Sequence, residues 1–376
     1  MKNKKSFVIA CGGTGGHLSP GIALAQRLTA LGYHCILLVS RKKIDARLSE
    51  KYTNLEFHQV PGCAFGLHPV KLLKFFYNLA ISIIYGVGLF LRHRPAAFVS
   101  FGGFLTIGVA IASKLLFIPI VLHEANRVPG KSVRIMSRIA TRIYLPPGVR
   151  LTGVTRFATR SAGFPVREEM HPLDKNVSRE RFGLPTTGKL LMVFGGSQGA
   201  RALNEWAVNV VPAMLEKGVS ILCVTGPGRE KDVENVPTKN STTGAVAKFI
   251  PFCDDMAAAL SAADLVVSRA GAGSLAEFVA CCVPAVLVPY PFAADNHQLA
   301  NAEFFREKGA GILIEEKDVP AQLTREVESI ILDDVLLSQL QENIRRMQRE
   351  FDWTNVVNDL VNYAEKNQRT LKSEQA

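Results

Sequence analysis

The segment Cys11-Gly12-Gly13-Thr14-Gly15-Gly16-His17 decides the fold predicted for this chain. An apolar run precedes it at residues 7–10, and the apolar residues of the stretch that follows, 18–28, recur at helical spacing. The pattern predicts a strand, a glycine turn and a helix. Glycines let the backbone take positive φ and approach a ligand closely, and the helix N-terminus offers unpaired N–H groups to an anion. Because no Gly-Lys-Ser/Thr follows, and Leu18 replaces the third glycine of a dinucleotide fingerprint, the segment alone indicates only a phosphate or sugar site.

The second half of the chain repeats this design. An apolar run at 189–194 leads into Gly195-Gly196-Ser197-Gln198-Gly199, and another at 264–268 leads into a glycine turn and a helix that carries Glu277. Strands that alternate with helices predict parallel sheets. We therefore expect an α/β fold with two doubly wound, Rossmann-like domains facing a cleft.

Length and charge support the division into two domains. A chain of 376 residues is long for one core. Residues 1–170 carry 23 Lys and Arg against 6 Asp and Glu, whereas residues 171–376 carry 21 against 27. We expect an N-terminal domain at 1–165, a C-terminal domain at 166–350, and a helix with a polar tail at 351–376. The basic first half favours a nucleic acid or an anionic membrane surface as a partner.

The seven cysteines are scattered without a C-x-x-C pair. This usage is typical of a reduced, cytoplasmic chain and indicates neither a disulfide framework nor a zinc site.

Residues 71–94 form an apolar stretch flanked by cationic residues. It can be a buried core helix, or an interfacial helix that dips aromatic side chains into a bilayer with Lys71 and Lys74 on the headgroups. A transmembrane span is disfavoured because the α/β pattern continues around it. A second helix is predicted to carry the cationic series Arg127, Lys131, Arg134, Arg138 and Arg142.

The glycine turns predict a diphosphate held by backbone amides and helix ends, with Ser197 adding a hydroxyl donor. Glu277 can accept both hydroxyls of a ribose, or it can simply interact with the helix dipole. His17 can take a proton from a hydroxyl near neutral pH, or it can orient a loop or a ligand. The sequence contains no Asp-x-Asp pair, which disfavours a metal-bridged diphosphate.

Five motifs in this order resemble a known family, the peptidoglycan glycosyltransferases that form lipid II from UDP-N-acetylglucosamine and undecaprenyl-diphosphate-muramoyl-pentapeptide (lipid I). The resemblance runs from about residue 6 to about residue 350. The motifs are Gly12-Gly13-Thr14-Gly15-Gly16-His17, His123-Glu124-x-Asn126, Gly163-x-Pro165-Val166-Arg167, Gly195-Gly196-Ser197-Gln198-Gly199-Ala200 and Asp295-x-His297-Gln298. The chain departs from the family at Phe164, where Asn is usual, at Ala125, where Gln is common, and at Cys253, where an aliphatic residue is usual.

The resemblance implies a GT-B type fold and an inverting transfer without metal or cofactor, in which His17 is the candidate base. It places Thr14, Gly15, Gly16 and Asn126 at the donor sugar, Arg167 and Ser197 at the diphosphate, and Phe252 and Cys253 at the uracil. It further implies that the nucleotide is lined by Ala272, Gly273, Ser274, Leu275, Ala276 and Glu277, with Glu277 on the ribose, and that Gln298 reaches the sugar.

The expected partners are UDP-N-acetylglucosamine, lipid I and an anionic membrane surface, with no nucleic acid. The expected location is the cytoplasmic face of the cell membrane, as a peripheral protein. A glycolipid synthase that uses diacylglycerol, a UDP-sugar epimerase and a membrane-docked nucleotide-binding module without activity are the alternatives.

Overall fold

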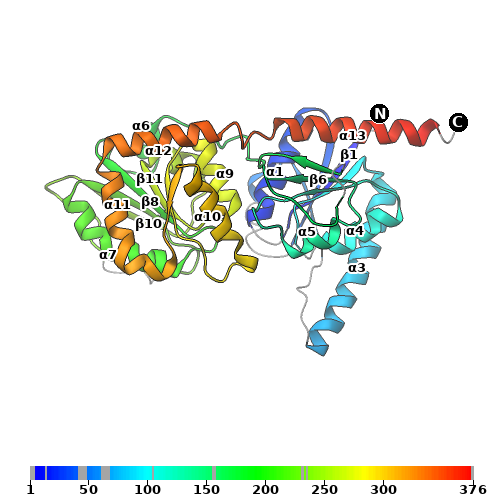
Figure 1. Ribbon diagram of the computed structural model, residues 1–376, viewed down its shortest axis with the longest axis horizontal. Coiled ribbons are helices and arrows are strands. Elements are labelled where there is room, and N and C mark those ends of the chain that lie inside the picture. The colour runs from blue at the N-terminus through cyan, green and yellow to red at the C-terminus, as the bar shows by residue number, and fades with distance from the viewer. Residues whose placement is uncertain are drawn as a thin grey trace. The chain divides into compact units, whose positions relative to one another are not determined.

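The computed structural model describes residues 5–12, 15–40, 49–60, 68–103, 106–154, 158–229, 233 and 236–373. The chain divides into two units (Figure 1). Unit 1 comprises residues 1–168 and 351–376, and unit 2 comprises residues 169–350.

Unit 1 is built, within its described residues, on one parallel sheet of seven strands in the order β3-β2-β1-β4-β5-β6-β7. The strands are β1 (Ser6–Ala10), β2 (His34–Val39), β3 (Glu56–Gln59), β4 (Ala97–Ser100), β5 (Ile120–His123), β6 (Arg142–Leu145) and β7 (Thr159–Ser161). The helices are α1 (Gly15–Ala30), α3 (Pro69–His93), α4 (Thr106–Leu115), α5 (Lys131–Met136) and α13 (Thr354–Ser373).

The period of two along β1 explains the layers of unit 1. Phe7 and Ile9 belong to a buried cluster with α1 and α13, and Val8 and Ala10 belong to a second cluster with α3, α4 and α5. Because side chains alternate across a strand, a strand that is apolar at every position needs helices on both faces.

Unit 2 has, among its described residues, a parallel sheet of six strands in the order β10-β9-β8-β11-β12-β13. The strands are β8 (Lys189–Phe194), β9 (Val219–Val224), β10 (Ala247–Ile250), β11 (Leu265–Ser268), β12 (Ala285–Leu287) and β13 (Gly311–Leu313). The helices are α6 (Lys175–Arg181), α7 (Arg201–Glu216), α8 (Met256–Ala262), α9 (Ala272–Cys281), α10 (His297–Glu307), α11 (Thr324–Ile331) and α12 (Asp334–Met347), with short turns η2 (Ala294–Asn296), η3 (Glu316–Asp318) and η4 (Val319–Leu323).

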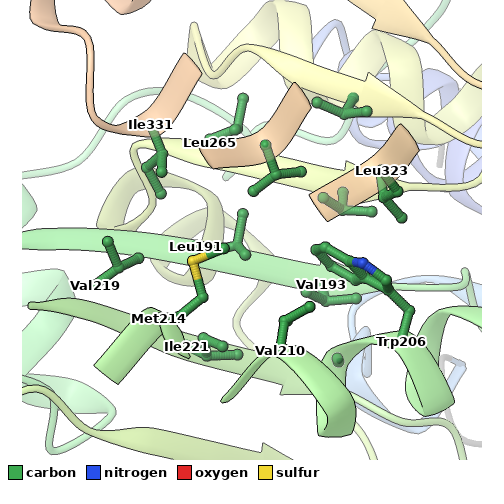
Figure 2. Packing of buried hydrophobic residues seen from close by; sticks show 14 of the residues in the cluster. Leu191, Val193, Trp206, Val210, Met214, Val219, Ile221, Leu265, Leu323 and Ile331 are labelled. Atoms are coloured by element: carbon green, nitrogen blue, oxygen red, sulfur yellow. The ribbon is translucent and has the colours of Figure 1, made fainter. Parts of the chain in front are cut away.

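The core of unit 2 is anchored by α7. Figure 2 shows Trp206, Val210 and Met214 of this helix gathered with side chains of β8 and β9. Trp206 also donates its indole N–H to Thr324 Oγ1 at 3.0 Å. Its rings are therefore packed in the core while its one polar group is hydrogen-bonded.

The C-terminal helix α13 packs on unit 1, because Val356, Val357 and Leu360 join the cluster of β1 and α1. Its Asp359 accepts the Tyr144 hydroxyl at 2.9 Å and pairs with Arg142 at 3.2 Å. The prediction that Arg142 lies on a cationic helix is therefore wrong. Helix α5 spans Lys131–Met136, so Arg127 and Arg138 also lie outside it. Arg142 is a buried residue of β6 whose guanidinium also stacks on Tyr363.

His123, at the end of β5, connects the sheet to residues 163–168, the segment that leads from unit 1 to unit 2. It is buried, and its Nε2 pairs with the Gly163 carbonyl oxygen at 3.0 Å. Phe164, the departure from the family, is buried edge-on against its ring. Burial lowers the pKa of His123 to about 4, although the Gly163 bond opposes the change.

This pKa predicts a specific pH dependence of unfolding. The folded pKa is lowered, so the unfolded chain binds the proton first as pH falls below about 6.5. Stability from His123 is present at pH 7, falls by about 3 kcal/mol between pH 6.5 and pH 4, and is constant below that. His123→Gln should flatten this part of the profile.

The measurement is urea unfolding followed through Trp353, in a Trp206→Phe background so that unit 1 reports alone. The exposed His68, also in unit 1, provides the control His68→Gln. Equal pH profiles for the two variants would contradict the assignment.

Candidate functional site

The strand order places the candidate site in each unit. In both sheets the order reverses beside the first strand, between β1 and β4 in unit 1 and between β8 and β11 in unit 2. In open parallel sheets ligands bind at the carboxyl ends of the strands, at this reversal. The glycine turns predicted from the sequence follow these four strands.

In unit 1 the turn after β1 closes without room for a side chain. A Cβ on Gly12 would lie 2.3 Å from the backbone nitrogen of Ser40, which follows β2. Helix α1 begins at Gly15, three residues before the predicted start, so Gly16 and His17 belong to its first turn. Thr14 lies outside the described residues.

The imidazole of His17 rests against the turn Gly102-Gly103 after β4. A Cβ built on Gly102 would lie 3.7 Å from His17 Nε2, and one on Gly103 would lie 3.7 Å from Nδ1. The ring is half-buried, and so it combines a packed face with access to solvent. An imidazole placed in this way, in the first turn of α1 and beside the turn after β4, remains a candidate general base.

Glu124 is a functional candidate that sequence reasoning gave no role. It is 4% exposed, and its Oε1 accepts the backbone N–H groups of Ala125 and Asn126 at 2.9 Å and the Asn126 side-chain amide at 3.0 Å. Its Oε2 accepts the N–H of Gly130, the residue before α5, at 2.8 Å. The carboxylate therefore fixes Asn126 and the start of α5. Its place directly after a strand was the signal that could have revealed it.

Arg167 lies in the segment that leaves unit 1. Its guanidinium is buried, and Nη1 donates to the Tyr52 hydroxyl at 3.1 Å. The neighbouring Glu168 N–H donates to Gln26 Oε1 of α1 at 3.2 Å. The predicted diphosphate ligand is thus anchored on unit 1.

In unit 2 the loops after β8 and β9 pack backbone against backbone. A Cβ on Gly199 would lie 2.0 Å from the Thr225 carbonyl oxygen, and one on Gly226 would lie 2.7 Å from that of Gln198. Both glycines have positive φ. Ser197 is exposed at the tip of the first loop, where its hydroxyl can meet a ligand.

Helices α7 and α9 begin at this edge of the sheet. The residues before them are Ala200 and Gly271, which have no side-chain acceptor and make no capping bond. The first N–H groups of such helices can bind an anion.

The predicted series along α9 separates into two sets. Ala272, Gly273, Ser274 and Glu277 are partly exposed, and they form the face that can meet a nucleotide. Leu275 and Ala276 are buried, and the Leu275 N–H is bonded to the Gly271 carbonyl oxygen. Their side chains support the helix from the core.

The remaining predicted residues of unit 2 lie at the same edge. Phe252 and Cys253 follow β10, with Phe252 half-buried and Cys253 buried. Gln298 lies in the first turn of α10, and its Oε1 accepts the Tyr290 N–H at 2.9 Å. Asp295 and Asn296, just before it, both have positive φ, which is strained for these residues. The structure therefore brings Ser197, Phe252, the α9 face and Gln298 to one edge of one sheet.

Within the described ranges, no three His, Cys, Asp or Glu side chains gather in a way that could hold a metal ion. Charged side chains at this edge include Glu277, Arg201, which pairs with Glu205, and Arg269, which pairs with Glu316.

Comparison with known proteins gives a consistent result. Residues 7–145 match the glycosyltransferase family 28 N-terminal domain, and residues 190–352 match the family 28 C-terminal domain. The crystal structure of MurG from Acinetobacter baumannii superposes with a TM-score of 0.68 over 96% of this chain and 99% of that one, at 24% identity. This likeness concerns the fold, and with the two family domains it confirms the predicted GT-B class of two Rossmann-like domains.

The curated relatives are similar along nearly their whole length. A protein of Opitutus terrae is 48% identical over 94% of both chains, and one of Nostoc sp. is 34% identical over 90% of this chain and 92% of its own. Both are named UDP-N-acetylglucosamine–N-acetylmuramyl-(pentapeptide) pyrophosphoryl-undecaprenol N-acetylglucosamine transferase. The chain is a glycosyltransferase and belongs to the family of these N-acetylglucosamine transferases.

Proposed function

We propose that this chain transfers N-acetylglucosamine from UDP-N-acetylglucosamine to the muramoyl 4-hydroxyl of lipid I and so forms lipid II for peptidoglycan. The full-length likeness at 48% identity carries the choice of substrates. The geometry by itself supports the chemical class, because two switch-point edges with open helix N-termini suit a sugar nucleotide.

Unit 2 is proposed to bind the donor. Ser197 and the first N–H groups of α7 and α9 neutralise the diphosphate, with Arg167 contributing from the connecting segment. Glu277 accepts the ribose hydroxyls, the backbone of Phe252 and Cys253 meets the uracil, and Gln298 meets the sugar. Thr14, Gly15, Gly16 and Asn126 of unit 1 are proposed to contact the sugar as well.

In the proposed reaction His17 takes the proton of the acceptor hydroxyl. The oxygen attacks the anomeric carbon, the bond from that carbon to the UDP oxygen breaks, and the configuration inverts. The negative charge that develops on the leaving diphosphate is stabilised by preorganised N–H dipoles, which cost no reorganisation during the reaction.

The proposed reaction is tested with labelled UDP-N-acetylglucosamine and a short-chain lipid I analogue. We expect lipid II analogue to form at an essentially unchanged rate in EDTA, because backbone dipoles supply the charge neutralisation. Diacylglycerol is the control acceptor, and donor alone controls for epimerisation. A strict, reversible requirement for magnesium or manganese would contradict the metal-free reaction, and transfer to diacylglycerol alone would contradict the acceptor.

Glu277→Ala should weaken donor binding through the lost ribose hydrogen bonds, by roughly 1.5–3 kcal/mol for bonds to a charged group. Calorimetry with UDP-N-acetylglucosamine measures the loss. Glu303, a half-buried glutamate on α10, gives the matched control Glu303→Ala. If both variants bind as the wild type does, Glu277 acts only on its helix.

The protein is further proposed to dock on the cytoplasmic face of the membrane through α3. By length and composition alone, Val70–His93 could cross a bilayer, with a mean hydropathy of 1.6. Its second half packs on α4, since Cβ atoms built on Gly86 and Gly108 would lie 2.9 Å from Ala112 Cβ and 2.6 Å from Ser82 Cβ. Leu89 and Phe90 are buried in unit 1. A span would pull these residues from the core, so partial insertion is favoured.

The first half of α3 is the inserting part. It extends away from the rest of unit 1 (Figure 1). It exposes large apolar side chains, namely Val70, Leu73, Phe76 and Tyr77, and the exposed Lys71 and Lys74 lie among them. The Ser82–Gly108 and Gly86–Ala112 contacts show that α3 runs parallel to α4, which begins beside the Gly102-Gly103 turn. The apolar end therefore lies at the strand edge that holds His17, where a membrane-anchored acceptor would arrive.

Docking should have an apolar component that survives salt and an electrostatic component of about 1 kcal/mol per basic residue that does not. We expect binding to anionic vesicles that high salt weakens without abolishing, and that Lys71→Glu/Lys74→Glu lowers. Leu73→Ser/Phe76→Ser should release the protein without unfolding it. Vesicle flotation measures binding, and circular dichroism checks the fold.

The control replaces two comparably exposed apolar residues of unit 2, as Leu332→Ser/Val335→Ser, and should bind as the wild type does. Wild-type protein that stays free of anionic vesicles at low salt would refute the docking face.

A further inference from the structure

The Gly102-Gly103 turn is held by hydroxyl groups from two helices. The Gly103 N–H donates to Ser132 Oγ of α5 at 3.0 Å. The Gly103 carbonyl oxygen accepts the hydroxyl of Thr106, the first residue of α4, at 2.8 Å. Both polar groups of one residue are thus fixed by side chains that are themselves buried.

This residue needs such a restraint. Gly102 and Gly103 have φ of 98° and 84°, a region where glycine is flexible and other residues are strained. Two further hydrogen bonds hold the turn, from the Gly102 N–H to Ser100 Oγ at 3.2 Å and from the Thr106 N–H to the Gly103 carbonyl oxygen at 3.3 Å. The Ser132 and Thr106 hydroxyls are the restraints that come from the side chains of α5 and α4.

The turn forms the surface against which the His17 ring lies. Cβ atoms built on the two glycines would stand 3.7 Å from its two ring nitrogens, and one on Gly103 would stand 3.5 Å from the Gly12 carbonyl oxygen. The bare backbone of Gly102-Gly103 therefore lies next to both the imidazole and the glycine loop that precedes it. A shift of the turn would therefore move the backbone surface on which the His17 imidazole packs.

The restraint extends back to Glu124. Its carboxylate holds the N–H of Gly130, directly before α5, and Ser132 lies in the first turn of that helix. Hydrogen bonds therefore tie Glu124 to the start of α5, and Ser132 of α5 to Gly103.

We propose that Ser132 and Thr106 are positioning residues, which set the place of the His17 imidazole through the Gly102-Gly103 turn. The inference rests on the proposed role of His17 as the base. It makes a separate claim, that hydroxyls outside the substrate contacts control the rate of transfer.

The test removes each hydroxyl and restores it. Ser132→Ala should lower kcat about tenfold or more, because small misplacements of a catalytic group cost this much, whereas KM for the donor and the affinity for UDP should stay within twofold. Ser132→Thr, which keeps the hydroxyl, should recover most of the rate. Ser137→Ala removes a similarly buried hydroxyl at the other end of α5, where it bonds to Arg134, and should keep the wild-type kcat.

Thr106 supplies an independent pair, in which Thr106→Val keeps the volume without the hydroxyl and Thr106→Ser keeps the hydroxyl without the methyl group. Thr106→Val should lose rate as Ser132→Ala does, and Thr106→Ser should retain it. This pair decides the question if Ser132→Ala fails to fold, which thermal unfolding reveals.

The outcomes separate this inference from the proposed function. If the wild type forms no product, the proposed function fails. If the wild type is active and the variants without a hydroxyl keep the rate of Ser137→Ala, the positioning role is refuted. Loss of rate and UDP affinity together, without recovery in Ser132→Thr and Thr106→Ser, would also refute it, because the hydroxyls would then be merely structural.

Discussion

Close approach of backbone to backbone at the carboxyl ends of parallel strands is the constraint on which this structure depends. A side chain on Gly12 would overlap the chain after β2, and one on Gly199 would overlap the chain after β9. Both loops close onto the neighbouring strand end, and only glycine permits the contact. The closure leaves helix N-termini open at the same edge, so the packing that shapes the fold also leaves N–H donors that can bind an anion.

The helix α3 meets two opposing demands. Its second half is a core helix, with Gly86 and Gly108 allowing the close approach to α4. Its first half exposes Leu73 at 74% and Tyr77 at 66%. Monomeric soluble proteins rarely expose neighbouring large apolar side chains to this extent. A single helix, Pro69–His93, therefore joins a buried second half to an exposed apolar first half. The interpretation as a core helix describes its second half, and the exposed apolar first half is the part proposed to insert into a bilayer.

Features that depend on local sequence patterns were predicted correctly, whereas features that depend on contacts with residues far away in the sequence were missed. The glycine turns, the alternation of strands and helices, and the resemblance of five motifs predicted the fold class and the family, both of which are confirmed. Spacing placed Arg142 on a helix, because its partners Asp359 and Tyr363 lie more than two hundred residues away. The resemblance placed Leu275 and Ala276 among the residues that line the nucleotide, and the structure buries their side chains, since consecutive residues of a helix cannot all share one face. Glu124 had only its place directly after a strand as a signal and Ser132 had none, since both act through the backbone N–H groups they hold.

The uneven charge of the two halves of the chain agrees with the different electrostatic interactions proposed for the two units. The excess of Lys and Arg in the first half includes the exposed Lys71, Lys74, Lys131 and Arg134, whereas Arg142 and Arg167 are buried in hydrogen-bonded or paired positions. In the acidic second half, the first N–H groups of α7 and α9, which have no side-chain caps, are the proposed donors to the diphosphate. Fixed dipoles in partly buried loops are screened by salt much less than exposed lysines are. The proposed docking to an anionic surface and the proposed recognition of a sugar nucleotide would then use electrostatic interactions of different range, and we expect ionic strength to change the first more than the second.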